Sequence, residues 1–237
     1  DWIVYNSNWN LEQHIKYFHI PQNKTLVIRN AIEKINFVEK PSDKINLVYH
    51  TTPWRGLKIL LKVFKNLNLE KVELNIFSST IIYGKKFDSV LGKTYEGLFN
   101  ECKNTKNVNY FGFLKNEKII EQLKKMHIFA HPSIWPETSC IAAIESMAAG
   151  CEVVTTNLGA LNETCSPFGK MINFEKRPED LEIKYSEALL DSIKNFWSDA
   201  TQKKLKLQRE TINATYSWDV RSAEWKKFFD EARKSKG

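Results

Sequence analysis

Two glutamates stand where a predicted strand, a loop and a helix meet. Glu137 and Glu145, with seven residues between them, lie in the stretch HPSIWPETSCIAAIESMAAG, residues 131–150. Loops at the carboxyl ends of parallel strands are where open α/β sheets bind ligands. The small and apolar residues after Ser139 predict a helix packed closely on a sheet, with Gly150 as its C-terminal stop. The pattern therefore predicts a small-molecule site around these two carboxylates.

The start of this helix favours an anion. A helix that begins near Ser139 points the free N–H groups of Thr138, Ser139 and Cys140 at the loop, which suits a phosphate. Glu145, about two turns into the helix, could accept hydrogen bonds from the neighbouring hydroxyls of a ribose, and Glu137 could hold sugar hydroxyls. Alternatively, Glu137 is a first-turn acid favoured by the helix dipole, and Glu145 is exposed on the helix surface. Spacing alone leaves both interpretations open.

Arg55 is a second candidate for anion binding. In HTTPWRGLKILL, residues 50–61, it follows a predicted strand and lies in the first turn of a helix. A cation is electrostatically unfavourable there. A diphosphate facing Arg55 would offset that cost, because a guanidinium binds phosphate oxygens bidentately. The alternative is a solvated surface arginine.

The elements that position these residues alternate along the chain. Apolar runs of period two alternate with segments of period near 3.6, which predicts an α/β fold with a parallel sheet flanked by helices. The predicted strands are 46–50, 72–76, 108–111, 128–131 and 152–156, followed by an apolar pair at 171–172. Helices are predicted from Pro53 through Phe64, at 119–126, 139–150, 181–197, 199–213 and 218–233. Residues 1–30 predict a short strand, a helix near 11–18 and an extended stretch at 25–28.

Composition narrows the classes of partner. The chain has no apolar run of about 18 residues and no signal-peptide pattern, and its four cysteines form no CxxC pair, so we expect a soluble cytoplasmic protein in a reducing compartment, without zinc. The net charge of +7 fits an anionic small molecule, a membrane surface or a nucleic acid. Nucleic acid is disfavoured, because the lysines scatter over nearly every helix and the aromatic residues have core-facing spacing. No basic amphipathic helix stands out, and peripheral contact with a membrane stays open.

Taken together, these residues resemble the retaining glycosyltransferases of family 4, which have the two-domain GT-B fold. The paired-glutamate motif of that family, with its small-residue helix ending in Gly, matches Glu137, Glu145 and Gly150. Its phosphate-contacting basic residue, placed before a Gly and an apolar helix, matches Arg55 and Gly56.

Further segments extend the resemblance over nearly the whole chain. NVNYFGFL (108–114) looks like the segment beside the nucleotide base, LGALNET (158–164) like the Gly-rich loop, RNAIE (29–33) like the interdomain linker and YSWDV (216–220) like the start of the last helix. The chain departs from the family at three positions. His50 stands where many members carry a second Arg, Asn162 where Pro is usual and Ala31 where Gly is usual.

The resemblance implies transfer of a sugar, with retention, from a nucleoside diphosphate sugar to a glycan or lipid-linked hydroxyl acceptor. UDP is expected because it is the commonest donor nucleotide of the family, and neither a cofactor nor a metal is implied. Glu137 and Arg55 are the implied catalytic residues. The implied donor-binding residues are His50, Gly56, Phe113, Leu114, Thr138, Ser139, Cys140, Ile141 and Glu145.

The resemblance also divides the chain. Residues 1–40 correspond to a remnant of an N-terminal domain and the interdomain linker, 41–212 to the Rossmann-like donor-binding domain, the C-terminal half of a GT-B fold, and 213–237 to a helix that crosses back. Because only the C-terminal one of the two GT-B domains is recognisable, the resemblance implies that the N-terminal domain, the acceptor side, is missing, and the start at Asp instead of Met agrees with this expectation. Two alternatives remain open at this point. They are an epimerase or phosphorylase on the same architecture and a non-catalytic nucleotide-sugar-binding module.

Overall fold

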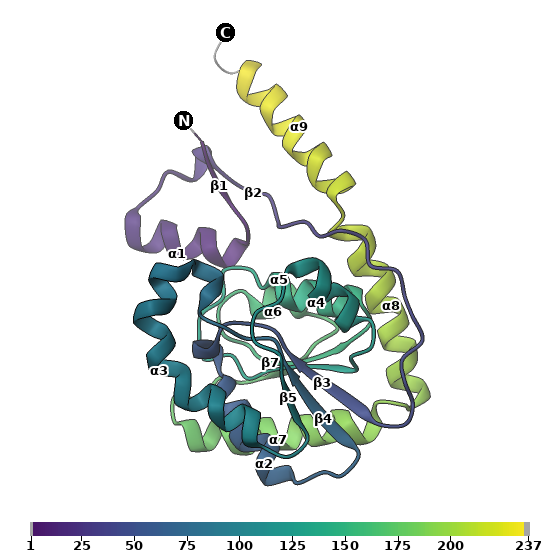
Figure 1. The fold of residues 1–237 in the computed structure, drawn as a ribbon. Coiled ribbons are helices and arrows are strands. Elements are labelled where there is room, and N and C mark those ends of the chain that lie inside the picture. The colour runs from purple at the N-terminus through teal and green to yellow at the C-terminus, as the bar shows by residue number, and fades with distance from the viewer. Residues whose placement is uncertain (1, 235–237) are drawn as a thin grey trace.

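The computed structural model describes residues 2–234 and is built around a six-stranded parallel sheet (Figure 1). Its strand order is β5-β4-β3-β6-β7-β8, and every neighbouring pair is parallel. These strands are β3 (Ile45–Tyr49), β4 (Val72–Ile76), β5 (Val108–Tyr110), β6 (Ile128–His131), β7 (Glu152–Thr156) and β8 (Lys170–Ile172). The predicted α/β class is therefore confirmed.

The sheet reverses its direction of growth at β3. The chain first adds β4 and β5 on one side of β3 and then returns to add β6, β7 and β8 on the other side. β3 and β6 thus become neighbours, with Leu47 opposite Ile128 and Val48 opposite Phe129. In open α/β sheets, the loops that leave two such strands diverge and open a crevice at their carboxyl ends.

Helices cover both faces of the sheet, because alternate strand residues point to opposite sides. Leu47 and Tyr49 belong to one buried cluster and Val48 to the other. The first cluster includes residues of α2 (Leu57–Leu67), α3 (Lys85–Asn104), α7 (Pro178–Asn195) and α8 (Asp199–Thr215). The second includes residues of α4 (Asn116–Leu123), α5 (Ile141–Ala148), α6 (Leu161–Cys165) and α8.

The two ends of the described chain lie at the same end of the molecule (Figure 1). There, β1 (Ile3–Tyr5) pairs in parallel with β2 (Thr25–Val27), with α1 (Asn8–Phe18) between them in sequence, and α9 (Trp218–Lys234) projects from the body. Exposed apolar side chains gather on and beside these elements, namely Trp2, which precedes β1, and Ile3, Tyr17, Phe18, Trp218 and Phe229. Among residues 2–234, no helix is long and apolar enough to cross a bilayer.

Two local structures differ most from the sequence expectations. The helix predicted from Pro53 is split: Pro53–Arg55 form a short 3₁₀ turn, η2, and the α-helix begins only at Leu57. Gly56 separates them, with its backbone so close to the carbonyl oxygen of Pro132 that an added Cβ would lie 2.1 Å from it. The second difference is α3, twenty residues long, for which the sequence pattern predicted no element.

Candidate functional site

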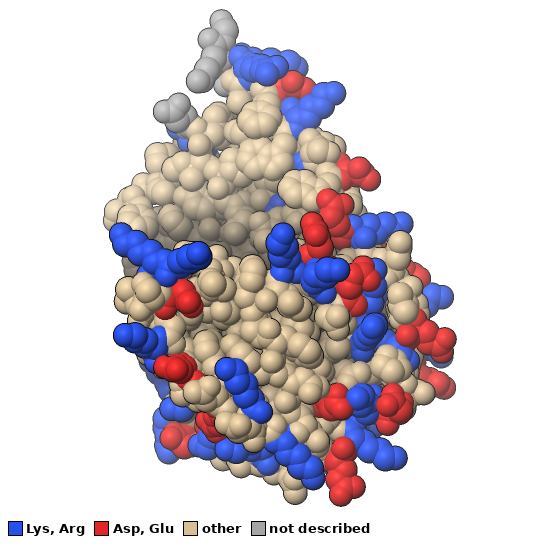
Figure 2. Space-filling view, in the orientation of Figure 1, with Lys and Arg blue, Asp and Glu red and all other residues tan. Residues whose placement is uncertain are grey.

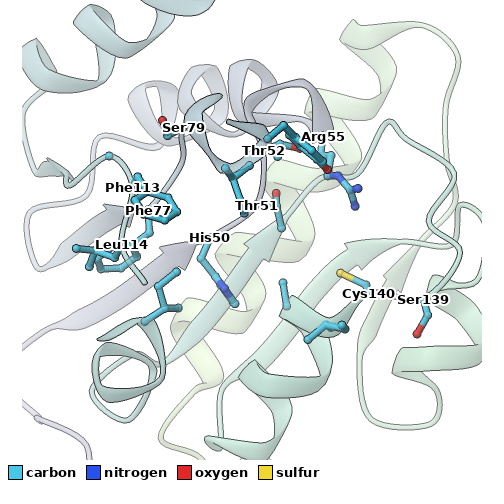
Figure 3. Close-up of a pocket in the computed structure, with 16 residues that line it drawn as sticks. His50, Thr51, Thr52, Arg55, Phe77, Ser79, Phe113, Leu114, Ser139 and Cys140 are labelled. Carbon is cyan, nitrogen blue, oxygen red and sulfur yellow. The ribbon is translucent and has the colours of Figure 1, made fainter. Parts of the chain in front are cut away.

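A cavity of about 350 Å³ opens at the carboxyl ends of the central strands. Its walls come from the segments that follow β3, β4, β5 and β6, as expected where the sheet reverses. Figure 3 shows Phe77, Phe113 and Leu114 on one side and Arg55, Ser139 and Cys140 on the other, with His50 between. The lining residues are His50, Thr51, Thr52, Arg55, Phe77, Ser79, Ile82, Tyr83, Gly112, Phe113, Leu114, Ile119, Ser139, Cys140, Ile141 and Ala142.

Arg55 reaches this cavity from the 3₁₀ turn and not from the first turn of an α-helix, as the sequence had suggested. The close packing of Gly56 on Pro132 presses the loop after β3 against the loop after β6. Arg55 is consequently only partly exposed and forms an ion pair with Glu137. The surface-arginine interpretation is therefore wrong, and in this structure the guanidinium already has a carboxylate partner.

The ion pair is the main electrostatic feature of the site. Burial works against the charged form of Arg55, but the attraction of Glu137 outweighs it and raises the pKa of the guanidinium. Burial also raises the pKa of Glu137, although Arg55 opposes that shift. A desolvated carboxylate that depends on a single cation for its charge is sensitive to any ligand that competes for that cation.

The loop that carries Glu137 is fixed by the turn after β7. The amide of Ala160 donates to the carbonyl oxygen of Glu137 at 2.7 Å, and Gly159 forms an isolated parallel bridge with Glu137. A Cβ on Gly159 would lie 2.5 Å from that same oxygen, so only glycine fits there. The segment 158–164, similar to a Gly-rich loop by sequence, therefore acts here as a support for Glu137.

The anion-binding end of α5 lies slightly further along the chain than expected. The helix begins at Ile141, not near Ser139, and the amides of Ala143 and Ile144 are already bonded to Cys140. The N–H groups without an intrahelical acceptor are thus those of Ile141 and Ala142, and both residues line the cavity. The amides available to bind an anion are therefore those of Ile141 and Ala142, and not the predicted ones of Thr138, Ser139 and Cys140.

Glu145 is neither exposed on its helix nor part of the cavity wall. Its side chain is buried, and Oε1 accepts a hydrogen bond from Asn116 at 2.8 Å. Burial raises the pKa of Glu145, with Asn116 opposing the shift. Contact with a ribose would require this carboxylate to be shared between Asn116 and the ligand.

His50, which takes the place of a second arginine, is uncharged in this environment. It lines the cavity, and its Nε2 lies 2.8 Å from the hydroxyl of Ser146. Burial lowers the pKa of His50 to about 4. The hydroxyl of Ser146 donates to the carbonyl oxygen of Ala142 at 2.7 Å, so it accepts the one N–H of the neutral His50 ring. At neutral pH His50 can therefore accept a hydrogen bond from a ligand, but it offers no positive charge.

Most of the predicted donor-binding residues meet at this cavity. Those that line it are His50, Phe113, Leu114, Ser139, Cys140 and Ile141, and Arg55, predicted to be catalytic, lines it too. The donor-binding candidates Gly56, Thr138 and Glu145 and the catalytic candidate Glu137 are not among the lining residues. The hydroxyl of Thr138 accepts a hydrogen bond from Asn6 at 3.4 Å, so this residue faces the N-terminal segment.

Sequence reasoning missed part of the apolar wall. Phe77 follows β4 directly and stacks on Phe111, with ring centroids 4.8 Å apart. Its place after a strand, like that of Ser79, was a signal that could have identified it. Ile82 and Tyr83 come from a short 3₁₀ turn, η3 (Ile81–Tyr83), whose sequence offers no such signal.

The described residues offer no obvious metal site. Between residues 2 and 234, no group of three or more His, Cys, Asp or Glu side chains is arranged to hold an ion. The four cysteines are buried free thiols. Lys and Arg side chains are scattered over the face seen in Figure 2 and do not form one stripe.

A family model described as "Glycosyl transferases group 1" matches residues 28–210. No curated protein matches the chain significantly.

Several solved structures share the fold. They include a glycosyltransferase from Rickettsia africae ESF-5 (TM-score 0.77, 19% identity, 98% of this chain and 63% of that chain) and sucrose-phosphate synthase from Thermosynechococcus elongatus (0.78, 16%, 99% and 59%). A third is HepE from Anabaena in complex with UDP-glucose (0.73, 15%, 97% and 64%). At these identities the likeness shows the fold alone. The present chain spans roughly three fifths of the length of each of these structures.

Proposed function

The chain belongs to the family of glycosyl transferases group 1, and from this premise we propose that it is the donor-binding half of a retaining glycosyltransferase of family 4. Its donor is a nucleoside diphosphate sugar, with UDP as the nucleotide, and its acceptor is the hydroxyl of a glycan or a lipid-linked glycan. In the reaction, the bond between the anomeric carbon and the diphosphate oxygen breaks. A new bond to the acceptor oxygen forms on the same face of the sugar, and the acceptor proton passes to the departing diphosphate.

One observation carries this proposal: a cation and two free helix amides face the same cavity. Arg55 lies on one side, and the N–H groups of Ile141 and Ala142 lie at the start of α5. Such a pair of groups suits the two negative charges of a diphosphate. Because negative charge grows on the diphosphate as it leaves, the same groups would stabilise the transition state.

Donor binding would change the ion pair. Arg55 has five N–H donors and contacts Glu137 through one of its nitrogens, so its other N–H groups can bind diphosphate oxygens. The diphosphate and the carboxylate then compete for one positive charge, and we expect the ligand to draw the guanidinium partly away from Glu137. The freed carboxylate of Glu137 can then accept hydrogen bonds from sugar hydroxyls, which is the role that the resemblance implies for it.

The apolar side of the cavity suits a nucleotide base. Phe77, Phe113 and Leu114 form that side, opposite Arg55 (Figure 3). Aromatic and aliphatic side chains provide a surface on which a flat base can pack. The choice of UDP is supported by a neighbour of the same fold, HepE, whose structure was solved with UDP-glucose.

A partner domain completes the proposal. The exposed apolar side chains on β1, α1 and α9 form a surface rarely left bare on a soluble protein. The chain also spans only about three fifths of its structural neighbours. We propose that an N-terminal domain covers this surface and supplies the acceptor site, so that turnover requires a longer protein.

Calorimetric titration with UDP, GDP and ADP in the presence of a chelator tests the donor site. We expect UDP to bind the chain without metal, and Arg55→Ala to weaken that binding by at least tenfold, the effect of about one charged hydrogen bond. Arg177→Ala is the matched control, because Arg177 is largely exposed and its one ion pair within residues 2–234 is with Asp180. Equal UDP affinity in Arg55→Ala and the native chain would contradict the proposed site.

Product analysis on the longer protein separates the alternatives. We expect transfer with retained anomeric configuration, and loss of turnover in Glu137→Ala. Conversion of the donor sugar without an acceptor would indicate an epimerase. Turnover unaffected by Glu137→Ala would contradict the catalytic role of this glutamate.

A further inference from the structure

Two buried polar atoms face each other at the back of the site without forming a hydrogen bond. They are Nε2 of His131 and Oε1 of Glu137, 4.0 Å apart. His131 is fully buried and Glu137 is 3% exposed, and neither atom has a hydrogen-bond partner among residues 2–234. Buried polar atoms without partners are rare, since each loses its hydrogen bonds to water on folding.

The surroundings of His131 indicate which of its ring nitrogens carries the proton. Nδ1 lies 3.4 Å from the hydroxyl of Thr155, which can donate to it and so place the ring proton on Nε2. The ring stacks on Phe129 with centroids 5.1 Å apart, which restrains its orientation. Burial, with Arg55 and His50 adding to it, lowers the pKa of His131 to about 3, so the ring is neutral at ordinary pH. In the Nε2–H tautomer, His131 aims its single N–H at Glu137.

The ion pair between Arg55 and Glu137 explains why this N–H has no acceptor. Arg55 holds Oε2 of Glu137 and so fixes the carboxylate. A donor diphosphate competes for Arg55, and a carboxylate without a donor in this buried position would be strongly unfavourable. The 4.0 Å gap exceeds a hydrogen bond of about 2.9 Å by roughly one ångström, which a small side-chain rotation can close.

We propose that His131 is the positioning residue for Glu137 in the donor complex. When the diphosphate engages Arg55, Nε2–H of His131 donates to Oε1 and keeps the carboxylate charged and pointed at the sugar. This inference rests on the proposed donor site, and it concerns a residue that the sequence marked only as the end of a strand.

A double-mutant cycle on UDP affinity tests the exchange of partners. In the native background, His131→Leu removes the replacement donor and should weaken UDP binding about tenfold, the fold-change that matches one hydrogen bond to a charged group. In the Glu137→Ala background there is no carboxylate to support, so the same change should alter affinity less than twofold. His131→Gln, whose amide can reach the position of Nε2, should recover most of the affinity in the native background.

The outcomes distinguish this inference from the function on which it rests. Equal losses from His131→Leu in both backgrounds would show a merely structural role, and no loss in either would show no role; both overturn the inference. If UDP binding depends on Arg55 but the double-mutant cycle shows no coupling between His131 and Glu137, the proposed donor site is retained and only the role of His131 is contradicted. Absence of UDP binding to the folded native chain would overturn both.

Nitrogen NMR of the histidine rings gives a second measure that is independent of folding defects in variants. The His131 signal, assigned by its loss in His131→Gln, should show the Nε2–H tautomer, and its proton should move downfield as UDP is added. An Nδ1–H tautomer, or a signal unchanged at saturating UDP, would overturn the inference.

Discussion

Replacing Gly159 with alanine should damage the site much more than replacing Gly150, although both glycines have a left-handed backbone. Their φ angles are +67° and +79°. At Gly150 a Cβ would meet only ordinary contacts of 3.7–3.8 Å, whereas at Gly159 it would lie 2.5 Å from the carbonyl oxygen and 2.6 Å from the nitrogen of Glu137. Comparison of the two alanine variants therefore distinguishes the effect of backbone strain, common to both, from the effect of displacing the Glu137 loop, expected only at Gly159.

The expected losses of stability and of binding follow from these contacts. The left-handed conformation costs an alanine about 1–2 kcal/mol at either position. At Gly159, relief of the clash to an ordinary 3.4 Å contact requires a shift of about 0.9 Å, which also strains the 2.7 Å hydrogen bond from Ala160 to Glu137, worth about 1 kcal/mol. A displacement near one ångström in a binding site can cost up to about a hundredfold in function.

Thermal unfolding and UDP titration check this prediction together. Gly150→Ala should lower the melting temperature by about 2–4 °C per kcal/mol of strain and leave the affinity for UDP unchanged. Gly159→Ala should lower the melting temperature further and weaken UDP binding at least tenfold, because Ser139 and Ile141 follow the displaced loop into the cavity wall. Equal melting temperatures and affinities in the two variants would refute the reasoning.

Three further predictions concern stability. Lys40→Met should lower the free energy of unfolding by about 2–4 kcal/mol in a denaturant titration, because the buried ammonium donates to Met126 and, at 3.2 Å, to Ala149 at the ends of two helices. The free energy of unfolding should also fall as the pH drops from 6.5 towards 4. Burial lowers the pKa of His127, His50 and His131 to about 4 or below in the folded protein, so these rings protonate readily only in the unfolded chain, and each costs at most about 1.4 kcal/mol per pH unit. The dependence of stability on pH should be shallower in His127→Gln. The buried glutamates of the site, with raised pKa values, act in the opposite direction. Glu163→Ala should speed proteolysis within residues 8–18, because this carboxylate caps α1 through the amides of Asn8 and Trp9; cleavage at the native rate would contradict that role.

The sheet was largely predictable because its strands are buried apolar runs with clear limits. The strands 72–76, 128–131 and 152–156 were predicted to the residue, and β3 begins and ends one residue earlier than predicted. In contrast, α3 packs mostly at the surface, with only Cys102 buried, and carries two internal glycines. Glycine is a poor helix former, so these two residues lower the helix propensity of the segment, and its apolar stripe was overlooked.

The sequence predicted which residues belong to the site better than it predicted which side chains those residues contact. The position of Arg55 and Ile141 after strands led to the cavity wall, because strand order alone brings such loops together. The pairing of Arg55 with Glu137 and of Glu145 with Asn116 joins residues far apart in sequence and depends on the packing of helices and loops. Periodicity carries no information on such contacts, which is also why His131 was read only as strand.

The adjacency of β3 and β6 has a consequence for how the molecule assembles. The segments 45–110 and 128–172 can each form strands with near neighbours in sequence, but the pairing of β3 with β6 closes a loop of some eighty residues and is entropically the most demanding step. The cavity beside Arg55 straddles that seam, so it exists only once the two halves have docked. A ligand bound in it would stabilise the docked form by mass action, and complementation between the two halves as separate chains would then be driven by the ligand.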